Sequence, residues 1–434
     1  MSEIIRLGEV ATIDASTVDK KSKDNEQQVR LCNFVDVYRN WVIVPEMVKG
    51  FMVATANQNE INKFSIKNGQ VAITKDSETR DDIGIPTYIT GDYENVILGY
   101  HCTLITPDSS VLNGEYLNAV LHTEYAKKYF AANASGSGQR YTLAEDVIAA
   151  FPVPLVPLNI QAKIGRIFSD IALKDINNDY ICVDLENMLK LLYEYWFVQF
   201  DFPDENGQPY KSSGGKMVWN EEIKREIPEG WRVIRLGDYI TADRGISYSS
   251  ETLEGAGVPM INLASFSVNS IYKHSGIKSY SGLYGNNQIL KPYDLIMCNT
   301  QQTAIDLEKD IIGKTILVPD IFDSDIVSSH HITHIGTTNN SLKYYINAES
   351  KTTWFHRYAA GFASGTKILG LDFEGIQGYK MILPPQHLLD KFAKISHDIE
   401  SKKSQIIREN IDLVSLRDLI LPLLITGQAR LKEI

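Results

Sequence analysis

The sequence predicts an α+β protein in which two similar globular domains are separated by two long helices that form an antiparallel coiled coil, with a pseudo-twofold internal repeat. Three observations predict this fold. The chain repeats itself at a constant offset, each copy contains short β-type runs, and each copy ends in a long segment with apolar residues at heptad spacing.

The duplication is visible as matching residues at an offset of 229. The matches are Arg6–Leu7–Gly8 with Arg235–Leu236–Gly237, Asp14 with Asp243, Gly84 with Gly313, His101 with His330, and residues 129–136 (YFAANASG) with 358–365 (YAAGFASG). Agreement at one offset over this distance indicates two copies of one folding unit.

Residues 1–157 and 231–384 are rich in short β-type runs punctuated by Asn, Gly and Asp, which is typical of strands joined by turns. The runs are VIVP (42–45), VAIT (71–74), CTLIT (102–106), DLIM (294–297) and TILVP (315–319). An amphipathic helix is expected near 115–131 and near 342–358. Each region is therefore predicted to be an α+β globule with a curved, mostly antiparallel sheet.

Proline-bearing segments, FPVPLVPL (151–158) and YKMILPP (379–385), end each copy, and a long helical pattern follows each. Steps of about 3.5 residues from Ile160 to Tyr195 are apolar at nine of eleven positions. The corresponding steps from Leu388 to Leu423 are also apolar at nine of eleven, and Lys174 and Lys402 occupy the same step. Such heptads predict a coiled-coil seam, in helices of roughly 54 Å each.

The two helical patterns have equal length and register, which favours their pairing with each other. The alternative is that each helix packs separately on its own domain. Residues 201–230 are polar and contain Gly and Pro, which is typical of a linker or an extended strap.

The predicted organisation follows from these boundaries. It consists of a first domain at 1–157, a central helix at 158–200, a linker at 201–230, a second domain at 231–384 and a C-terminal helix at 385–434.

The net charge of −11 counts against strong DNA binding by the chain alone, because phosphate contacts need clustered Lys and Arg. It does not exclude DNA binding, because an acidic protein can carry a basic face or a partner can supply the missing contacts.

The four cysteines are far apart, and the start of the chain lacks the pattern of a secretion signal. No apolar run is long enough to cross a membrane. A cytoplasmic location with free thiols is therefore expected.

Known catalytic motifs are missing from the sequence. A DNA-amino methyltransferase needs Asn/Asp-Pro-Pro-aromatic, and the nearest match is Leu383–Pro384–Pro385–Gln386. No phosphate-binding GxxxxGK[ST] loop and no G-x-S-x-G elbow are found. The histidines His330, His331 and His334 lack further metal-ligand spacing, so an ordinary polar strand is favoured over a metal site. We therefore expect no catalysis, no metal and no cofactor on this chain.

Residues 189–238 closely resemble the central segment and second-domain start of the specificity subunits of type I restriction–modification systems. The distinctive parts are the aromatic run 193–200 (YEYWFVQF), SSGGKM (212–217) and IPEGWRVIRLGD (227–238). SLRDLILPLLITGQARL (415–431) resembles the closing helix of the family. With both LGE/LGD starts and both proline-rich exits, the resemblance spans nearly the whole chain.

This resemblance implies two target-recognition domains, each reading one half of a bipartite, asymmetric sequence in double-stranded DNA. It also implies that the helices fix the gap between the half-sites and that two modification subunits, which bind S-adenosylmethionine and methylate adenine, dock on the chain. Restriction subunits with ATP-driven translocase and nuclease activity, and with Mg²⁺, join the complex in the cytoplasm of a bacterium or archaeon.

Loops matched between the repeats are the candidate DNA contacts, because Arg and Lys suit guanine or phosphate and Gln suits adenine. They are 74–82 with 298–310, and 134–141 with 363–368. The alternative is that these loops are ordinary solvated turns. Arg244 and Tyr248, which follow the first predicted strand of the second domain, are further candidates. The candidate residues are Lys75, Thr79, Arg80, Ser137, Gln139, Arg140, Tyr141, Arg244, Tyr248, Gln301, Gln302, Thr303, Lys309, Thr366 and Lys367.

The aromatic residues Tyr193, Tyr195, Trp196 and Phe197 have two interpretations. Packing between the helix and the second domain is favoured, and a docking surface for a modification subunit is the alternative. Two other functions also compete with DNA specificity for the whole chain. One is an enzyme, either a stand-alone nuclease or a fused methyltransferase, and the other is a repeat scaffold or adhesin-like module.

Overall fold

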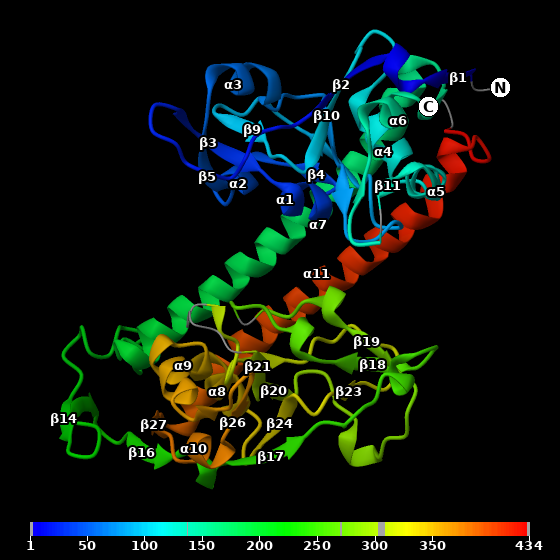
Figure 1. Ribbon diagram of the computed structural model, residues 1–434. Coiled ribbons are helices and arrows are strands. Elements are labelled where there is room, and N and C mark those ends of the chain that lie inside the picture. The colour runs from blue at the N-terminus through cyan, green and yellow to red at the C-terminus, as the bar shows by residue number, and fades with distance from the viewer. Residues whose placement is uncertain (1–2, 137, 270, 303–308, 432–434) are drawn as a thin grey trace. The chain divides into compact units, whose positions relative to one another are not determined.

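The structure is a computed structural model that describes residues 3–136, 138–269, 271–302 and 309–431. The chain divides into two compact units. Unit 1 combines residues 1–177 with 410–434, and unit 2 consists of residues 178–409 (Figure 1). The sequence-based boundaries at 157, 200, 230 and 384 stay predictions, because the units divide the long helices between them.

Unit 1 is built on a five-stranded sheet in the order β2-β10-β6-β8-β4. Its central strands are apolar and buried on both faces, as expected where helices cover a sheet. All neighbours pair antiparallel except β4 with β8. The strands are β2 (Ala11–Ala15), β4 (Val42–Ile43), β6 (Val71–Thr74), β8 (Pro86–Ile89) and β10 (Cys102–Pro107).

Smaller elements surround this sheet. A second sheet has the order β5-β3-β9, and β1 pairs antiparallel with β13. The strands are β1 (Glu3–Arg6), β3 (Gln27–Cys32), β5 (Met52–Ala56), β9 (Val96–Leu98) and β13 (Pro152–Leu155), and the short helices are α1 (Phe34–Arg39), α2 (Pro45–Val48), α3 (Gln58–Phe64) and α6 (Glu145–Ala149).

Unit 2 repeats the same topology. Its main sheet has the order β17-β24-β20-β22, its second sheet the order β19-β18-β23, and β16 pairs with β27. The elements are β16 (Arg232–Arg235), β17 (Ile240–Arg244), β18 (Val258–Ile261), β19 (Lys278–Tyr280), β20 (Leu295–Cys298), β22 (Thr315–Leu317), β23 (Val327–Ser328), β24 (Ile332–Thr337), β27 (Lys380–Leu383) and α10 (Phe373–Gln377). In both second sheets the central strand has one antiparallel and one parallel neighbour.

Each amphipathic helix expected from the sequence is a pair of helices. Unit 1 has α4 (Gly114–Leu121) and α5 (Glu124–Asn133), and unit 2 has α8 (Leu342–Ser350) and α9 (Thr353–Ala360). The break falls at Thr123 in one unit and at Thr352 in the other, where the hydroxyl accepts from the backbone N–H three residues later at 3.3 Å. A threonine N-cap starts a new helix at this point.

Gly84 and Gly313 confirm that the repeat extends to local detail. Both adopt positive φ, at 75° and 72°, which favours glycine. A Cβ on Gly84 would lie 2.5 Å from the Phe130 ring, and one on Gly313 would lie 2.6 Å from Cβ of Ala359. The two glycines are therefore required at the same place in both units.

One predicted match differs by a residue. The carbonyl of His101 accepts from the Lys75 backbone N–H at 2.9 Å, and in unit 2 the carbonyl of His331 accepts from that of Asn299 at 3.0 Å. His331, and not His330, therefore occupies the place of His101. A one-residue shift of the turn before β24 accounts for the difference.

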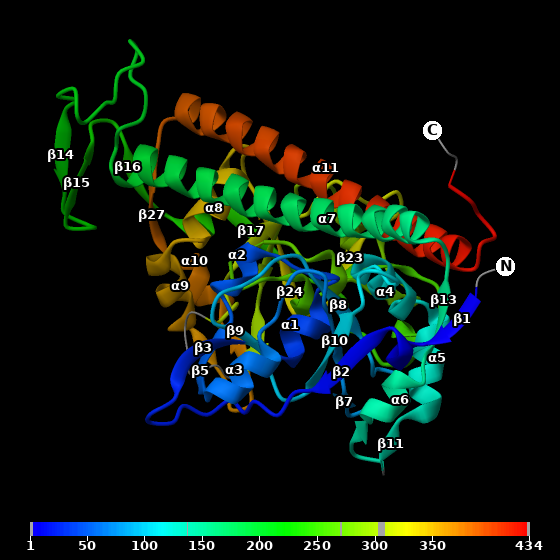
Figure 2. The same ribbon diagram turned by 90° about the horizontal axis from the view of Figure 1, so that it is seen from above.

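The two long helices are α7 (Leu158–Tyr193) and α11 (Gln386–Ile425), and a π-helical turn at Glu194–Val198 continues α7. Within unit 2, Asn178 donates to Glu409 at 2.9 Å and Lys403 donates to Glu186 at 2.7 Å. Ascending positions of α7 thus meet descending positions of α11, so the predicted antiparallel pairing is confirmed there (Figures 1 and 2). The α+β class, the duplication and the two long helices are confirmed as well.

The predicted seam is confirmed only in part: Ile164, Asn178, Leu388, Phe392 and Ile406 are buried as expected, but two positions of α7 are not. Ile181 and Met188 were expected inside, but they are 44% and 57% exposed, whereas Cys182 and Leu189 are 5% and 6% exposed. Lys174 and Lys402 are exposed too. The inner face also includes buried charged side chains, so the apolar heptad follows this face over only part of each helix.

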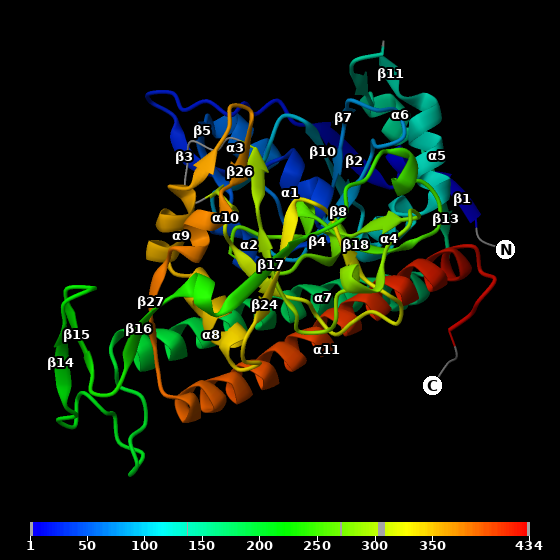
Figure 3. The same cartoon turned by 90° about the horizontal axis from the view of Figure 1, so that it is seen from below.

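Residues 201–230 are more structured than a linker. They contain a hairpin of β14 (Met217–Asn220) and β15 (Arg225–Pro228) that extends from the sheets of unit 2 (Figure 3). Phe202 and Ile227 join the core of unit 2, and the Phe202 ring stacks on Trp231. In the part of the chain that the structure describes, no helix is long and apolar enough to span a membrane.

Candidate nucleic-acid interface

The two loops predicted to contact DNA in each half meet in a small three-stranded sheet. In unit 1 the order is β11-β12-β7, and in unit 2 it is β21-β26-β25. The strands are β7 (Asp76–Ser77), β11 (Ser135–Gly136), β12 (Tyr141–Thr142), β21 (Thr300–Gln302), β25 (Ala363–Ser364) and β26 (Ile368–Leu371). Loops about sixty residues apart in the sequence therefore form one surface within each unit.

A glycine at the same position closes the hairpin of both small sheets. Gly136 and Gly365 have φ of 146° and 144°. A Cβ would lie 2.1 Å from the carbonyl oxygen of Arg140 in the first case and 2.0 Å from that of Ile368 in the second. Because glycine has no side chain, the backbone of the returning strand can come close at this position. Both hairpins share this close approach.

Asp76 organises the polar side of the unit 1 sheet. It accepts from the Thr142 hydroxyl at 2.6 Å, contacts Nδ1 of His101 at 2.8 Å and pairs with the Arg140 guanidinium at 3.2 Å. Burial alone would raise the Asp76 pKa, but these hydrogen bonds and Arg140 outweigh it and lower the pKa. The carboxylate thus stays charged and orients the half-exposed Arg140 side chain.

The remaining unit 1 candidates lie around this sheet. The Arg80 guanidinium stacks 5.2 Å from the Tyr141 ring centroid, and the Lys75 ammonium lies 4.5 Å from that of Tyr100. The Lys75 ammonium also donates to the Ser16 carbonyl at 3.0 Å, so part of its hydrogen-bonding capacity is used within the protein. Thr79 and Gln139 are exposed, and Ser137 lies outside the described residues.

The unit 2 candidates are less uniformly placed. Gln301, expected to face adenine, is only 7% exposed, and its side-chain oxygen accepts from the Ile311 backbone N–H, so it holds its own loop. Gln302 belongs to β21, and Thr303 lies outside the described residues. The exposed candidates are Arg244, Lys309, Thr366 and Lys367, and Tyr248 is half-buried.

Sequence reasoning missed several residues of these surfaces. Asp76, Tyr100 and His101 join the unit 1 set, and Lys278 lies 5.2 Å from the Tyr248 ring in unit 2. His101 could have been found from the sequence, because the second copy of the repeat also has a histidine at the equivalent turn. No sequence pattern pointed to Lys278, because it belongs to β19, a strand that is distant in the sequence from the candidate loops.

The aromatic run at the end of α7 is mainly interior. Tyr193, Trp196 and Phe197 are 3%, 7% and 3% exposed and belong to the core of unit 2, while Tyr195 is 40% exposed. Of the four candidates for partner docking, Tyr195 is therefore the one with an accessible side chain. The packing interpretation accounts for the other three.

An exposed apolar pair occurs at the same place in both copies of the long helix. Met188 and Leu191 on α7 are 57% and 64% exposed, and Leu416 and Leu419 on α11 are 47% and 65% exposed. The first pair belongs to unit 2 and the second to unit 1. Large apolar side chains this exposed on a helix suggest a surface that is covered by a partner.

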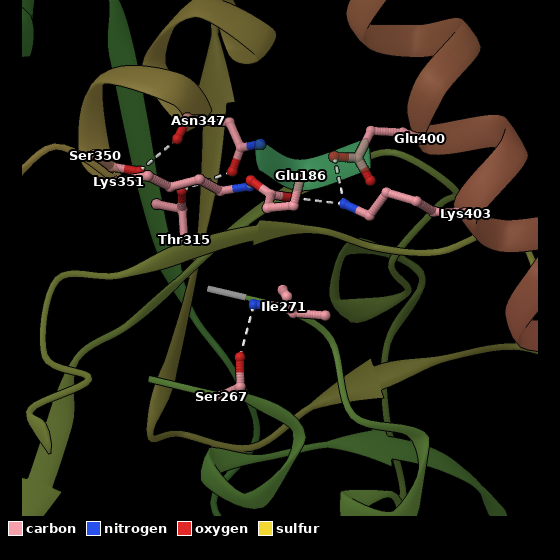
Figure 4. A network of polar contacts seen from close by, with 9 residues as sticks. All are labelled: Glu186, Ser267, Ile271, Thr315, Asn347, Ser350, Lys351, Glu400 and Lys403. Atoms are coloured by element: carbon pink, nitrogen blue, oxygen red, sulfur yellow. Dashed lines mark hydrogen bonds and ion pairs between the residues drawn. The ribbon is translucent and has the colours of Figure 1, made fainter. Parts of the chain in front are cut away.

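A buried ion network joins α7, α8 and α11 within unit 2 (Figure 4). The Glu186 carboxylate accepts from Lys351 at 2.5 Å and from Lys403 at 2.7 Å, and Lys403 also contacts Glu400 at 3.0 Å. The network borders a cavity of about 830 Å³ whose wall also includes Arg357. In the described part of the chain, no group of three His, Cys, Asp or Glu residues could hold a metal ion.

Comparison with known proteins finds a matching domain model and several relatives. Residues 2–181 match the type I restriction modification DNA specificity domain. The type I restriction enzyme MjaIX specificity subunit of Methanocaldococcus jannaschii is 24% identical over 76% of this chain and 72% of its own length. The HindI specificity subunit of Haemophilus influenzae is 23% identical over 84% of this chain and 88% of its own length.

The fold is shared with a solved protein. The S subunit of a type I restriction–modification system from M. genitalium has a TM-score of 0.54 at 13% identity, covering 98% of this chain and 96% of that one. The matched domain is a DNA specificity domain, and the fold of the whole chain is similar to that of a solved S subunit. The resemblance inferred from the sequence is thereby confirmed: the chain is similar to type I specificity subunits, through the matched domain and through relatives that align over most of its length.

Proposed function

We propose that each unit reads one half of a bipartite, asymmetric DNA sequence through the surface around its small three-stranded sheet. The observation that carries the proposal is the occurrence of the same sheet, with the same glycine-closed hairpin, in both units. Arg80 and Arg140 in unit 1, and Arg244 and Lys367 in unit 2, offer side chains that suit guanine edges or phosphates. The fifteen candidate contacts remain predictions as individual residues.

The two long helices are proposed to set the spacing between the half-sites and to dock two adenine-methyltransferase subunits. The equivalent exposed pairs, Met188 with Leu191 and Leu416 with Leu419, support two equal docking places, one on each unit. An apolar strip on a helix suits a partner helix that lays its own apolar face against it.

The chain is proposed to be non-catalytic, with S-adenosylmethionine, ATP and Mg²⁺ bound by the modification and restriction subunits in the cytoplasm of a bacterium or archaeon. The absence of methyltransferase and phosphate-loop motifs from the full sequence supports this division of labour. Docked subunits would also bring basic surface to a chain whose net charge is −11.

Mapping adenine methylation in cells that express this chain with its cognate modification subunit tests the proposal. We expect one bipartite motif that disappears when the chain is deleted. Replacing residues 1–157 with those of another specificity subunit should change one half-site and leave the other unchanged. A swap that changes both half-sites contradicts the assignment of one half-site to each unit.

Two outcomes would favour the competing functions. Methyl transfer or DNA cleavage by the purified chain alone would support an enzyme. A folded complex that leaves DNA unmethylated and binds duplexes without sequence preference would support a scaffold.

A further inference from the structure

Five side chains converge in unit 2 beside the small sheet β21-β26-β25. The Lys278 ammonium lies 5.2 Å from the Tyr248 ring centroid, and that ring lies 5.6 Å and 6.4 Å from the rings of His330 and His331. The two histidine rings are 3.9 Å apart. Arg244 at the end of β17 completes the group, which we call the histidine-turn cluster.

The cluster touches the sheet through the backbone. Asn299 directly precedes β21, its N–H donates to the His331 carbonyl at 3.0 Å, and its side-chain amide donates to the His330 carbonyl at 3.2 Å. The histidine turn is therefore fixed to the strand that carries Gln301 and Gln302. A ligand at the small sheet would lie close to this turn.

The positive charges of the cluster are not paired with carboxylates of the protein in the part of the chain that the structure describes. Arg244 and Lys278 form no ion pair with a carboxylate among the described residues, although the chain has 54 acidic residues and 43 Lys and Arg. Burial lowers the His331 pKa first, and the neighbouring His330, Lys278 and Arg244 lower it further. Lys278 and Arg244 therefore place positive charge beside the His331 ring.

Both histidine rings are partly exposed. Nδ1 of each ring is buried and has no hydrogen-bond partner among the described residues. A buried N–H without an acceptor is rare in folded proteins, which places the proton of each neutral ring on Nε2. Two N–H donors beside two cations form a site for an anion.

The equivalent histidine in unit 1 is arranged differently. His101 contacts the Asp76 carboxylate at 2.8 Å and the Arg140 guanidinium at 3.0 Å. In unit 1 the protein therefore supplies the negative charge beside the histidine itself, as the Asp76 carboxylate. The two units share a fold here but not a charge balance.

We propose that the histidine-turn cluster binds a phosphodiester group of the DNA backbone, so that unit 2 holds one phosphate at a place where unit 1 holds its own carboxylate. This inference rests on the proposed DNA recognition by unit 2. It assigns the cluster to the DNA backbone rather than to base edges. The cluster offers cations and imidazoles, which suit phosphate oxygens, and it contains no Asn or Gln side chain of the kind that reads adenine. Binding at this site is sequence-independent and positions the duplex on unit 2.

The test uses the full chain in complex with its modification subunit and measures duplex affinity over a range of salt concentrations. The double variant Lys278→Gln with Arg244→Gln should reduce the slope of log affinity against log salt by about 0.9, because the one phosphate held at the cluster then keeps its counterion. Each single substitution should give a smaller reduction. The loss should be equal for cognate and non-cognate duplexes. Lys224→Gln, on the exposed β14–β15 hairpin of the same unit, is the matched control and should leave the slope unchanged.

Three results would overturn the inference. Folded variants with unchanged slopes would show that no phosphate is held there, and a loss confined to the cognate duplex would assign the cluster to base reading. If inorganic phosphate bound the unsubstituted complex more tightly than the double variant while both bound duplexes equally well, the site would belong to free phosphate and not to DNA. A wild-type complex that prefers no duplex sequence would instead contradict the proposed function.

Discussion

Lys403 on α11 donates to Glu186 on α7 across 2.7 Å, and the side chains are only 8% and 10% exposed. Lys351, the residue that caps the end of α8, contacts the other carboxylate oxygen of Glu186, so one buried carboxylate links α7, α11 and the end of α8. Buried charges are strongly unfavourable unless all of them are paired. The pairing therefore restricts α7 and α11 to the register in which these groups meet, as a single polar residue does in other coiled coils.

Glu186→Gln should lower the free energy of unfolding by about 3–5 kcal/mol, because it leaves two buried ammonium groups without their shared carboxylate. Urea denaturation followed by circular dichroism measures the change. Asp323→Asn is the control, since it breaks the exposed ion pair with Arg408 and should cost under about 1 kcal/mol. Equal effects of the two substitutions would contradict a structural role for the network.

The same carboxylate should make stability depend on acid pH. Burial would raise the Glu186 pKa, but Lys351 and Lys403 outweigh burial and lower it to about 2, below the ordinary value of 4.5. The stabilisation is therefore present above about pH 4.5 and is lost as the pH falls through 2. Unfolding free energies measured between pH 5 and pH 2 should fall more steeply for the unsubstituted chain than for Glu186→Gln, and parallel profiles would refute the assignment.

The long helices show what periodicity can and cannot predict. The heptad pattern correctly predicted two long, paired helices, because few structures other than paired helices sustain an apolar repeat over some 36 residues. It failed at Ile181 and Met188 because it counts apolar side chains, and these two are apolar but exposed. Glu186 and Lys403 are buried by pairing with groups far away in the sequence, and a pattern within one helix cannot detect such partners.

The candidate interface was predictable to a similar extent. The repeat offset identified the four loops, but strand pairing between loops sixty residues apart is non-local, so the small sheets were not foreseen. Gln301 carries a chemistry that suits adenine, yet its side chain faces its own loop, because the direction of a strand residue depends on register. Residue type alone could not settle that orientation.

Trp196→Ala and Tyr195→Ala should separate packing from docking at the end of α7. Trp196 lies in the aromatic core beside Phe197 and Phe392, so its truncation should cost about 3–5 kcal/mol of stability. Tyr195 is largely exposed, so its truncation should leave the unfolding free energy within about 1 kcal/mol. Thermal unfolding of both variants measures this, and a Trp196→Ala protein as stable as the original would contradict the core assignment.

Gly365→Ala should disturb the small sheet of unit 2 far more than Gly370→Ala. A Cβ at Gly365 would meet a backbone oxygen at φ 144°, whereas one at Gly370 would meet nothing within 4 Å. We expect a cost of about 1–3 kcal/mol for the first substitution and weaker binding of DNA by the complex. Denaturation and duplex titration measure the two effects, and the idea fails if Gly370→Ala is the more damaging change.

Replacing Met188 and Leu191 by Glu should remove one of two methyltransferase subunits while unit 2 stays folded. The charges would have to be buried against the partner, and an exposed helix position tolerates them in the free chain. The same change at Leu416 and Leu419 should remove the other subunit, and all four changes together should leave none. Native mass spectrometry of the assembled complex counts the subunits, and Lys190→Glu on the same helix controls for added negative charge. Full occupancy of both places in the fourfold variant would show that the methyltransferases dock elsewhere, because four buried carboxylates on the two helices could not coexist with an intact apolar contact.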